Sequence, residues 1–161
     1  MRFHRTLLQG IVKLLSGFFL IAGFSLVHAQ ELSLLRMASD TNLEWGPCPA
    51  FIGKGCQIAV LHGDPSKDNS DIFFKVPADF KIPLHWHTSP ERMVLVAGKL
   101  DVRYEGEKTN TLNVNSYAYG PAKKPHKAYC HKGGECILFI AFEKPIDAYE
   151  VKGKACMEKG I

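Results

Sequence analysis

An all-β, antiparallel fold is predicted by three features of this 161-residue sequence. From Ile58 onward, short runs rich in β-branched and aromatic residues, such as IFFKV, RMVLVAG and CILFIAF, are separated by turn segments such as GDPSKDNSD. The runs recur at nearly regular intervals, which is typical of an antiparallel sandwich or barrel. Helix is expected only in ELSLLRMAS, residues 31–39, and in part of the tail after Pro145.

The first 29 residues have the three parts of an export signal. Arg2 and Arg5 precede the apolar run LLSGFFLIAGFSLV, which ends at VHA. A basic start, an apolar middle and a small residue at the cleavage point are typical of a secretory signal. A retained membrane anchor is the alternative, because residues 11–27 are near the lower limit for spanning a bilayer. We expect cleavage after Ala29, a periplasmic or secreted protein, and no stable membrane span.

The part that follows the signal suits one domain with one core. We expect an N-terminal extension with an edge strand at 30–60, a barrel at 61–145 and a C-terminal tail at 146–161. Cleavage would remove three of the 20 basic residues, which leaves 17 against 16 acidic ones and lowers the formal charge from +4 to +1. No basic stripe remains, so we expect no nucleic-acid partner.

Within the barrel, the strand patterns distinguish two environments. In KLDVRYEG, Leu100, Val102 and Tyr104 alternate with charged residues. One face of this strand is therefore expected to lie in the core, and the other to face solvent or to form ion pairs. MVLVA and ILFIAF are apolar on both faces, as expected of strands inside a two-layer β structure. By alternation alone, four aromatic residues are candidates for the barrel wall: Tyr104, Tyr119, Phe139 and Phe142.

Three residues of metal-ligand type cluster in IPLHWHTSPERMVLVAG. In an extended strand, His85 and His87 point to one side and Trp86 to the other, because side chains two apart share a face. Pro90 favours a turn, so a strand returning from Glu91 would carry the carboxylate back towards the histidines. A single hairpin is therefore predicted to supply three ligands to one ion.

A fourth candidate ligand, His126, lies in GPAKKPHKAYC after Pro125, which holds the preceding backbone extended. A barrel could bring it opposite the hairpin. Beside it is a basic cluster, Lys123, Lys124 and Lys127, for which a solvated loop is the usual explanation; a rim that attracts anionic substrates is the alternative. His62 and His131 are expected to have structural or exposed positions outside the site.

The five cysteines predict disulfides, because export permits them. The first predicted pair is Cys130 with Cys136, which a three-residue hairpin loop would place opposite each other and a two-residue turn would not. The second is Cys48 with Cys56. An odd count leaves Cys156 free or paired between chains. A zinc cluster is the alternative, against which stand the export signal and the lack of a Cys-x-x-Cys pair.

These residues resemble the two sequence motifs of the cupin superfamily. His85, His87, Glu91 and Gly98 fit G-x5-H-x-H-x3,4-E-x6-G, while Pro121 and His126 fit G-x5-P-x-G-x2-H-x3-N. The resemblance covers roughly residues 73–142. The sequence departs from the motifs at four positions, none of which is a metal ligand: Asp79, Asn115 and Lys123 in place of glycines, and Cys130 in place of asparagine. The residue at position 123 affects the conformation of the turn that orients His126.

The resemblance implies a double-stranded β-helix, also called a jelly roll or cupin barrel, with one divalent metal held by His85, His87, Glu91 and His126. Independently of family, three neutral nitrogens and one carboxylate suit Mn, Fe, Co, Ni, Cu or Zn. Four protein ligands leave up to two positions open on an octahedral metal for a small molecule.

Three functions are compatible with this site. The first is an exported, metal-dependent enzyme, oxygenase-like in its reaction, that acts on a small molecule. The second is a metal-dependent ligand-binding or redox-sensing module without turnover. The third is a metal-stabilised structural barrel; the resemblance also implies pairing into a homodimer, for which Trp45 to Leu61 could supply an edge strand.

Overall fold

The computed structural model describes residues 31–152. The predicted signal at 1–29, Cys156 and most of the C-terminal tail lie outside these residues. The chain divides into two units, Met1–Leu34 and Leu35–Ile161, and the sheets described below belong to the second.

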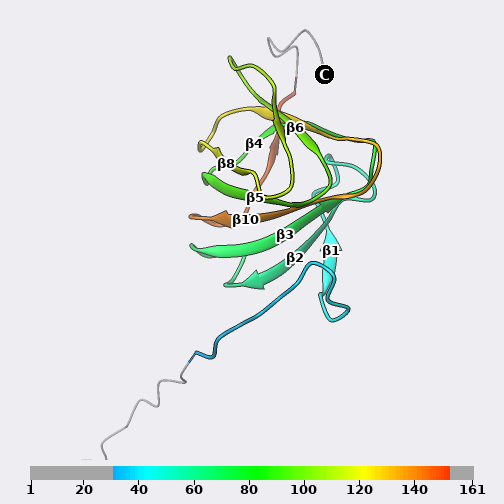
Figure 1. The fold of residues 1–161 in the computed structure, drawn as a ribbon. Helices are drawn as coiled ribbons and strands as arrows, with labels where there is room; N and C mark the ends of the chain where they lie inside the picture. The colour runs from blue at the N-terminus through cyan, green and yellow to red at the C-terminus, as the bar shows by residue number, and fades with distance from the viewer. Residues whose placement is uncertain (1–30, 153–161) are drawn as a thin grey trace, which may run out of the picture. The chain divides into compact units, whose positions relative to one another are not determined.

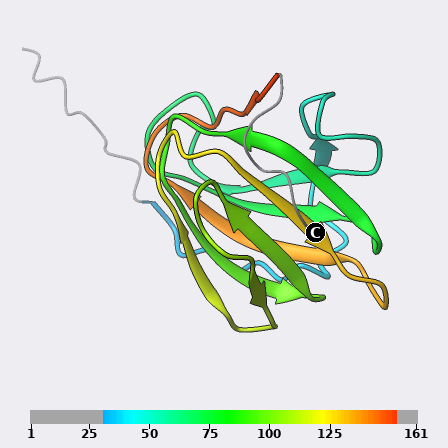
Figure 2. The ribbon, with the colours of Figure 1, turned by 90° about the horizontal axis from the view of Figure 1, so that it is seen from above.

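Eleven strands form two antiparallel sheets in the described part of the chain (Figures 1 and 2). The six-stranded sheet has the order β1 (Trp45–Pro47), β2 (Gln57–His62), β3 (Ser70–Val76), β10 (Cys136–Phe142), β5 (Glu91–Ala97), β8 (Tyr117–Gly120). The five-stranded sheet has the order β11 (Tyr149–Glu150), β4 (Phe80–Trp86), β9 (His126–Cys130), β6 (Leu100–Tyr104), β7 (Asn110–Leu112). The predicted all-β antiparallel jelly roll is confirmed.

Both helix predictions are wrong for the residues that the structure describes. Residues 31–39 contain only coil and a turn, and the chain after Pro145 contributes β11 instead. Leu35 is 82 % exposed, so its side chain does not pack against other apolar residues. An amphipathic helix depends on such packing for most of its stability. Between residues 31 and 152, no helix is long and apolar enough to cross a membrane.

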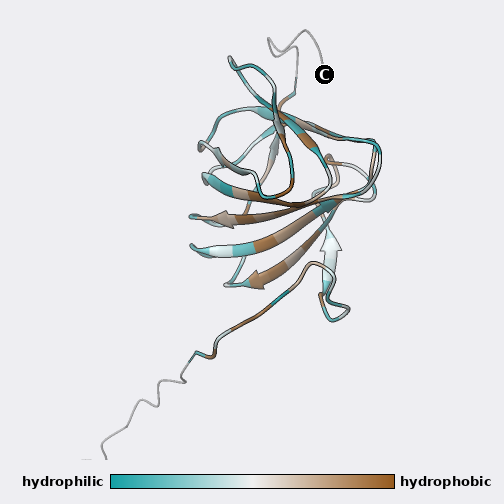
Figure 3. Cartoon of the chain, in the orientation of Figure 1, coloured by the Kyte–Doolittle hydropathy of each residue, from teal (hydrophilic) through white to brown (hydrophobic). Residues whose placement is uncertain are grey.

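The core lies between the two sheets, where the apolar faces of their strands meet. Leu100, Val102 and Tyr104 are buried, as their alternation predicts. Figure 3 shows brown, apolar segments along β2, β3 and β10. Of the four wall candidates, Tyr104 and Phe142 line the interior.

Tyr119 and Phe139 do not line the interior. Tyr119 is 52 % exposed because it lies on the edge strand β8, beside Arg92 of β5. Phe139 alternates with two interior residues, Leu138 and Ile140, and therefore lies half-buried on the outer face of β10.

Both predicted disulfides are present, Cys48–Cys56 and Cys130–Cys136, with Cα–Cα distances of 5.5 and 5.8 Å. The hairpin predicted around the second pair is absent, because Cys130 ends β9 in one sheet and Cys136 begins β10 in the other. This disulfide therefore joins the two sheets.

The predicted hairpin between residues 85 and 91 is wrong for the same reason. β4 belongs to the five-stranded sheet and β5 to the six-stranded sheet, so the segment after Trp86 crosses from one sheet to the other. His85 and Glu91 consequently come from different sheets and reach the same interior.

Candidate metal centre

Three histidines gather at one place in the interior. His85 of β4 and His126 of β9 are cross-strand partners, and their ring centroids lie 4.2 Å apart. His87 follows the end of β4, with its ring centroid 4.8 Å from that of His85. All three are buried, and each offers a ligand atom within 4.8 Å of the others. The geometry is that of a group able to hold a metal ion.

A bulge in β4 positions His85. Ile82 pairs with Ala128 and His85 pairs with His126, so β4 has one more residue than β9 over this stretch. The extra residue brings both Ile82 and His85 to the interior, although they are three positions apart. Pro83 lies within the bulge, where a residue without a backbone N–H is tolerated.

Each imidazole is oriented by a backbone carbonyl. The Nδ1 atoms of His85 and His126 lie 2.7 Å from Pro83 O and 3.1 Å from Lys124 O, and Nδ1 of His87 bonds Asp147 O. A carbonyl only accepts, so Nδ1 carries the proton and donates it. In the neutral ring the Nε2 lone pair is then the free one, an arrangement that commonly fixes metal-binding histidines.

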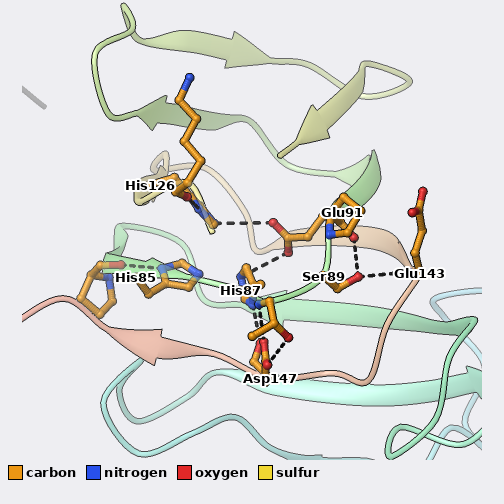
Figure 4. A network of polar contacts seen from close by, with 11 residues as sticks. His85, His87, Ser89, Glu91, His126, Glu143 and Asp147 are labelled. Atoms are coloured by element: carbon orange, nitrogen blue, oxygen red, sulfur yellow. Dashed lines mark hydrogen bonds and ion pairs between the residues drawn. The ribbon is translucent and has the colours of Figure 1, made fainter. Parts of the chain in front are cut away.

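Glu91, the first residue of β5, completes the group from the opposite sheet. Its Oε1 lies 3.4 Å from Nε2 of His87, and its Oε2 lies 3.6 Å from Nε2 of His126. Figure 4 shows the carboxylate facing these two rings. All four residues predicted as ligands are therefore together in the interior.

Burial disfavours charge on His85, His126 and Glu91. Desolvation, followed by the neighbouring His87, lowers the pKa of His85 to about 4. The same desolvation, with His85 and His87 nearby, lowers the pKa of His126 well below its ordinary value. Burial raises the pKa of Glu91, and His87 partly offsets this. The three imidazoles and the buried carboxyl group form a donor set that a divalent transition metal fits.

The loops around the site keep the backbone that the motif glycines would supply. Asp79, Asn115 and Lys123, which stand in place of those glycines, have φ values of 60°, 72° and 60°. The Lys123 backbone N–H donates to His87 O at 2.7 Å, so the loop that leads to His126 is tied to His87. The departure at Lys123 thus leaves His126 facing the other ligands.

The centre opens into an apolar cavity of about 130 Å³. Its wall is formed mainly by aliphatic and aromatic side chains of both sheets, including Ile72, Phe74, Ile82, Met93, Val102, Leu112, Leu138 and Phe142. Two further segments contribute: Cys48, Pro49 and Ile52 from the disulfide loop, and residues 146–148 before β11.

Residues 146–148 were not predicted as part of the site. The Asp147 carboxylate accepts a 2.8 Å hydrogen bond from the Thr88 backbone N–H and another from the Thr88 hydroxyl. This clip holds the Asp147 carbonyl against His87. Asp147 is 59 residues from Thr88 in sequence, so no local pattern connects the two.

Several other predicted features lie away from the centre. Trp86 stacks on Tyr149, with ring centroids 4.5 Å apart, and does not line the cavity. Lys124 forms an ion pair with Glu107, in keeping with a solvated loop. His131 lies 3.0 Å from the Asp101 carboxylate.

Comparisons with known proteins agree with this fold. A family model described as a domain of unknown function, DUF4437, matches residues 29–147. No curated protein matches the sequence.

Solved structures with the same fold carry differing names. The DMSP lyase DddQ from Ruegeria pomeroyi is 16% identical, with a TM-score of 0.59 over 70% of this chain and 63% of the lyase chain. The polyketide cyclase RemF from Streptomyces resistomycificus is 16% identical, with a TM-score of 0.60 over 73% and 86%.

A cupin 2 domain-containing protein from Halorhodospira halophila is also 16% identical, with a TM-score of 0.52 over 61% and 71% of the two chains. The fold is therefore that of the cupin superfamily. The chain spans less than two thirds of the length of the lyase.

Proposed function

The chain belongs to the DUF4437 family and has the cupin fold, and we propose that it is an exported, metal-dependent enzyme that acts on a small molecule. One observation carries this proposal: three buried histidines and a buried glutamate converge from two sheets beside an apolar cavity. Enzyme sites are commonly concave, mostly apolar and equipped with a few convergent polar groups.

His85, His87, His126 and Glu91 would hold the metal, through the three Nε2 atoms and the carboxylate. Fe, Mn, Co, Ni, Cu and Zn all suit such a set, so supply in the compartment would decide among them. When bound, the ion would act as a Lewis acid on an oxygen atom of the substrate.

The chain's own residues prepare the site. Backbone carbonyls of Pro83, Lys124 and Asp147 fix the three rings, so that little reorganisation is needed on binding. The apolar wall excludes water from the reacting group and strengthens electrostatic interactions within the site.

For the reaction we propose oxygenase-like chemistry, supported by a ligand set that leaves metal positions for dioxygen and substrate. The neighbours named as a lyase and a cyclase support a non-redox reaction as the competing possibility. Oxygen consumption separates the two.

A ligand-binding module without turnover is the second candidate. The observation that favours it is the scarcity of acid–base groups: besides the four proposed ligands, the titratable side chains along the described cavity wall are Tyr104 and Asp147, and the Asp147 carboxylate is bonded to Thr88. Redox sensing by such a module would take place at the metal, and a thiol could contribute only through Cys156, since the other four cysteines are in disulfides.

Export and dimerisation are further parts of the proposal. The predicted signal at 1–29 and the two disulfides support a periplasmic or secreted location.

An apolar cross-strand row on the outer face of the six-stranded sheet supports a homodimer. The row runs through the paired residues Trp45, Ala59, Phe73, Phe139, Val94 and Tyr117. Ala59 and Phe73 are buried within the chain, so the surface open to a partner is that of the half-buried Trp45, Phe139 and Val94 and of Tyr117, which is 63 % exposed.

Turnover tests the proposal. The full chain, expressed with its own signal, would be reconstituted separately with Fe(II), Mn(II), Ni(II), Cu(II) and Zn(II), and incubated with a panel of small organic acids while oxygen uptake and NMR spectra are recorded. An enzyme gives products in excess of protein, and Glu91→Gln abolishes them while His131→Ala does not. Saturable binding without product under every metal would favour the binding module.

A further inference from the structure

The hydroxyl group of Tyr104 is buried without a hydrogen-bond partner among the described residues. Tyr104 lies at the end of β6, is 5 % exposed and lines the cavity. Buried tyrosine hydroxyls normally find partners, and an unsatisfied one is unfavourable. Phenylalanine would fill the same space without that penalty, so the hydroxyl points to a missing partner.

The Tyr104 side chain lies beside the metal centre. A Cβ atom on Gly120 would lie 2.5 Å from Tyr104 Oη and 3.0 Å from Glu91 Oε2. A Cβ atom could not lie so close to the hydroxyl, so the missing side chain of Gly120 is what lets both oxygen atoms lie against this stretch of backbone. On its other side the Tyr104 ring contacts His126, with centroids 4.9 Å apart.

The residues that line the cavity restrict the class of ligand that it can bind. No lysine or arginine lines the described wall, and the Asp147 carboxylate is held by Thr88. The volume of about 130 Å³ is close to the roughly 150 Å³ of an apolar cavity that binds benzene. A small molecule with an apolar body and a single polar head fits these walls.

We propose that the cavity binds a small monocarboxylate with an apolar body, whose head group lies at the metal centre and accepts a hydrogen bond from Tyr104 Oη. This inference rests on the metal-dependent function proposed above. A divalent ion with ionised Glu91 has one net positive charge, which a monoanion neutralises. A second carboxylate would be buried without a cation, because the wall offers none.

Calorimetric titration of the metal-reconstituted full chain tests the ligand class. The probes are acetate, butyrate and hexanoate, with succinate and butyramide as size-matched partners of butyrate. Affinity should rise severalfold with each added methylene, because each buries more apolar surface. Succinate and butyramide should bind at least tenfold more weakly than butyrate. Equal affinity along the series, equal binding of succinate, or no binding by any carboxylate would overturn the proposal.

Two variants test the role of Tyr104 as a ligand-binding residue. Tyr104→Phe should weaken butyrate binding about tenfold or more, since a hydrogen bond to a charged group is lost, while metal content stays unchanged. Tyr119→Phe, on the exposed edge strand, is the matched control and should bind like the wild type. Gly120→Ala keeps the hydroxyl but leaves it no room in its present position, and should also weaken binding.

The outcomes separate the two proposals. Absence of bound metal would contradict the proposed function itself. Normal metal content with equal butyrate affinity in Tyr104→Phe and Tyr119→Phe would overturn only the present inference, and would indicate that an ordered water is the partner of Tyr104.

Discussion

Tyr104 and His126 are cross-strand partners on β6 and β9, and His126 in turn pairs with His85 on β4. One row across the five-stranded sheet therefore places a phenol and two imidazoles side by side on its inner face. Glu91 reaches the same place from the six-stranded sheet. The site depends on how the two sheets face each other, and the predictions below test its separate parts.

The clip between Thr88 and Asp147 should matter for metal affinity. Asp147→Ala removes the carboxylate that accepts from Thr88, so the Asp147 carbonyl is no longer held against His87. We expect metal affinity to fall about tenfold, as is typical for partners that orient ligands. Competition with a chromophoric chelator measures it.

Asp68→Ala is the control for this variant. It also removes an acidic side chain, but one that forms a surface ion pair with Lys144 and bonds none of the proposed metal ligands. Equal metal affinity in the two variants would show that the clip does not position His87.

Acid should destabilise the metal-free protein. The pKa of His85 is about 4 when folded and 6.5 as its ordinary value, so the unfolded chain binds the proton first as the pH falls below 6.5. The free energy of unfolding is thereby lowered by about 3 kcal/mol near pH 4, and protonation of His126 lowers it further. Glu91 acts oppositely: its raised pKa favours the folded state at low pH, and this contribution is lost as the pH rises.

Urea denaturation of the metal-free protein between pH 4 and pH 7 measures this dependence. His85→Gln should flatten it, because glutamine does not titrate. Stability that stays constant as the pH falls, with the same profile in His85→Gln, would contradict the assignment of a buried neutral imidazole.

Lys123 has a left-handed backbone that glycine adopts more readily. Lys123→Gly should therefore raise the free energy of unfolding by about 0.5–1 kcal/mol. Lys124→Gly should lower it, since that residue loses its pair with Glu107 and gains chain entropy on unfolding. Thermal denaturation compares the two, and a destabilised Lys123→Gly would show that the lysine side chain outweighs the backbone strain.

The disulfides predict a definite thiol count. Four cysteines are paired, so the denatured but unreduced chain should react with a thiol reagent once, at Cys156. Five thiols should react after reduction. Three or five reactive thiols before reduction would contradict one or both pairings.

The strands and the ligand candidates could be predicted from the sequence because both depend on local spacing. The period of two in KLDVRYEG identifies Leu100, Val102 and Tyr104 as interior residues, and the spacing of His85, His87 and Glu91 is readable within seven residues. The disulfide pairs follow from proximity in sequence.

Sheet membership could not be predicted, because it depends on contacts between distant segments. A turn such as TSP between β4 and β5 reads equally well as a hairpin or as a crossing between sheets. The Asp147 clip and the pairing of Tyr104 with His126 likewise join positions far apart in the chain. The bulge in β4 had one local signal, Pro83 inside a strand.

The metal content of the full chain tests the central claim most directly. The protein would be purified from its own export compartment, without added metal or an affinity tag of histidines, and analysed by elemental mass spectrometry. We predict close to one equivalent of a divalent transition metal, lost in His87→Ala and in His126→Ala but retained in His131→Ala, with circular dichroism spectra unchanged. No bound metal even after reconstitution, or full metal content in the site variants, would contradict the account.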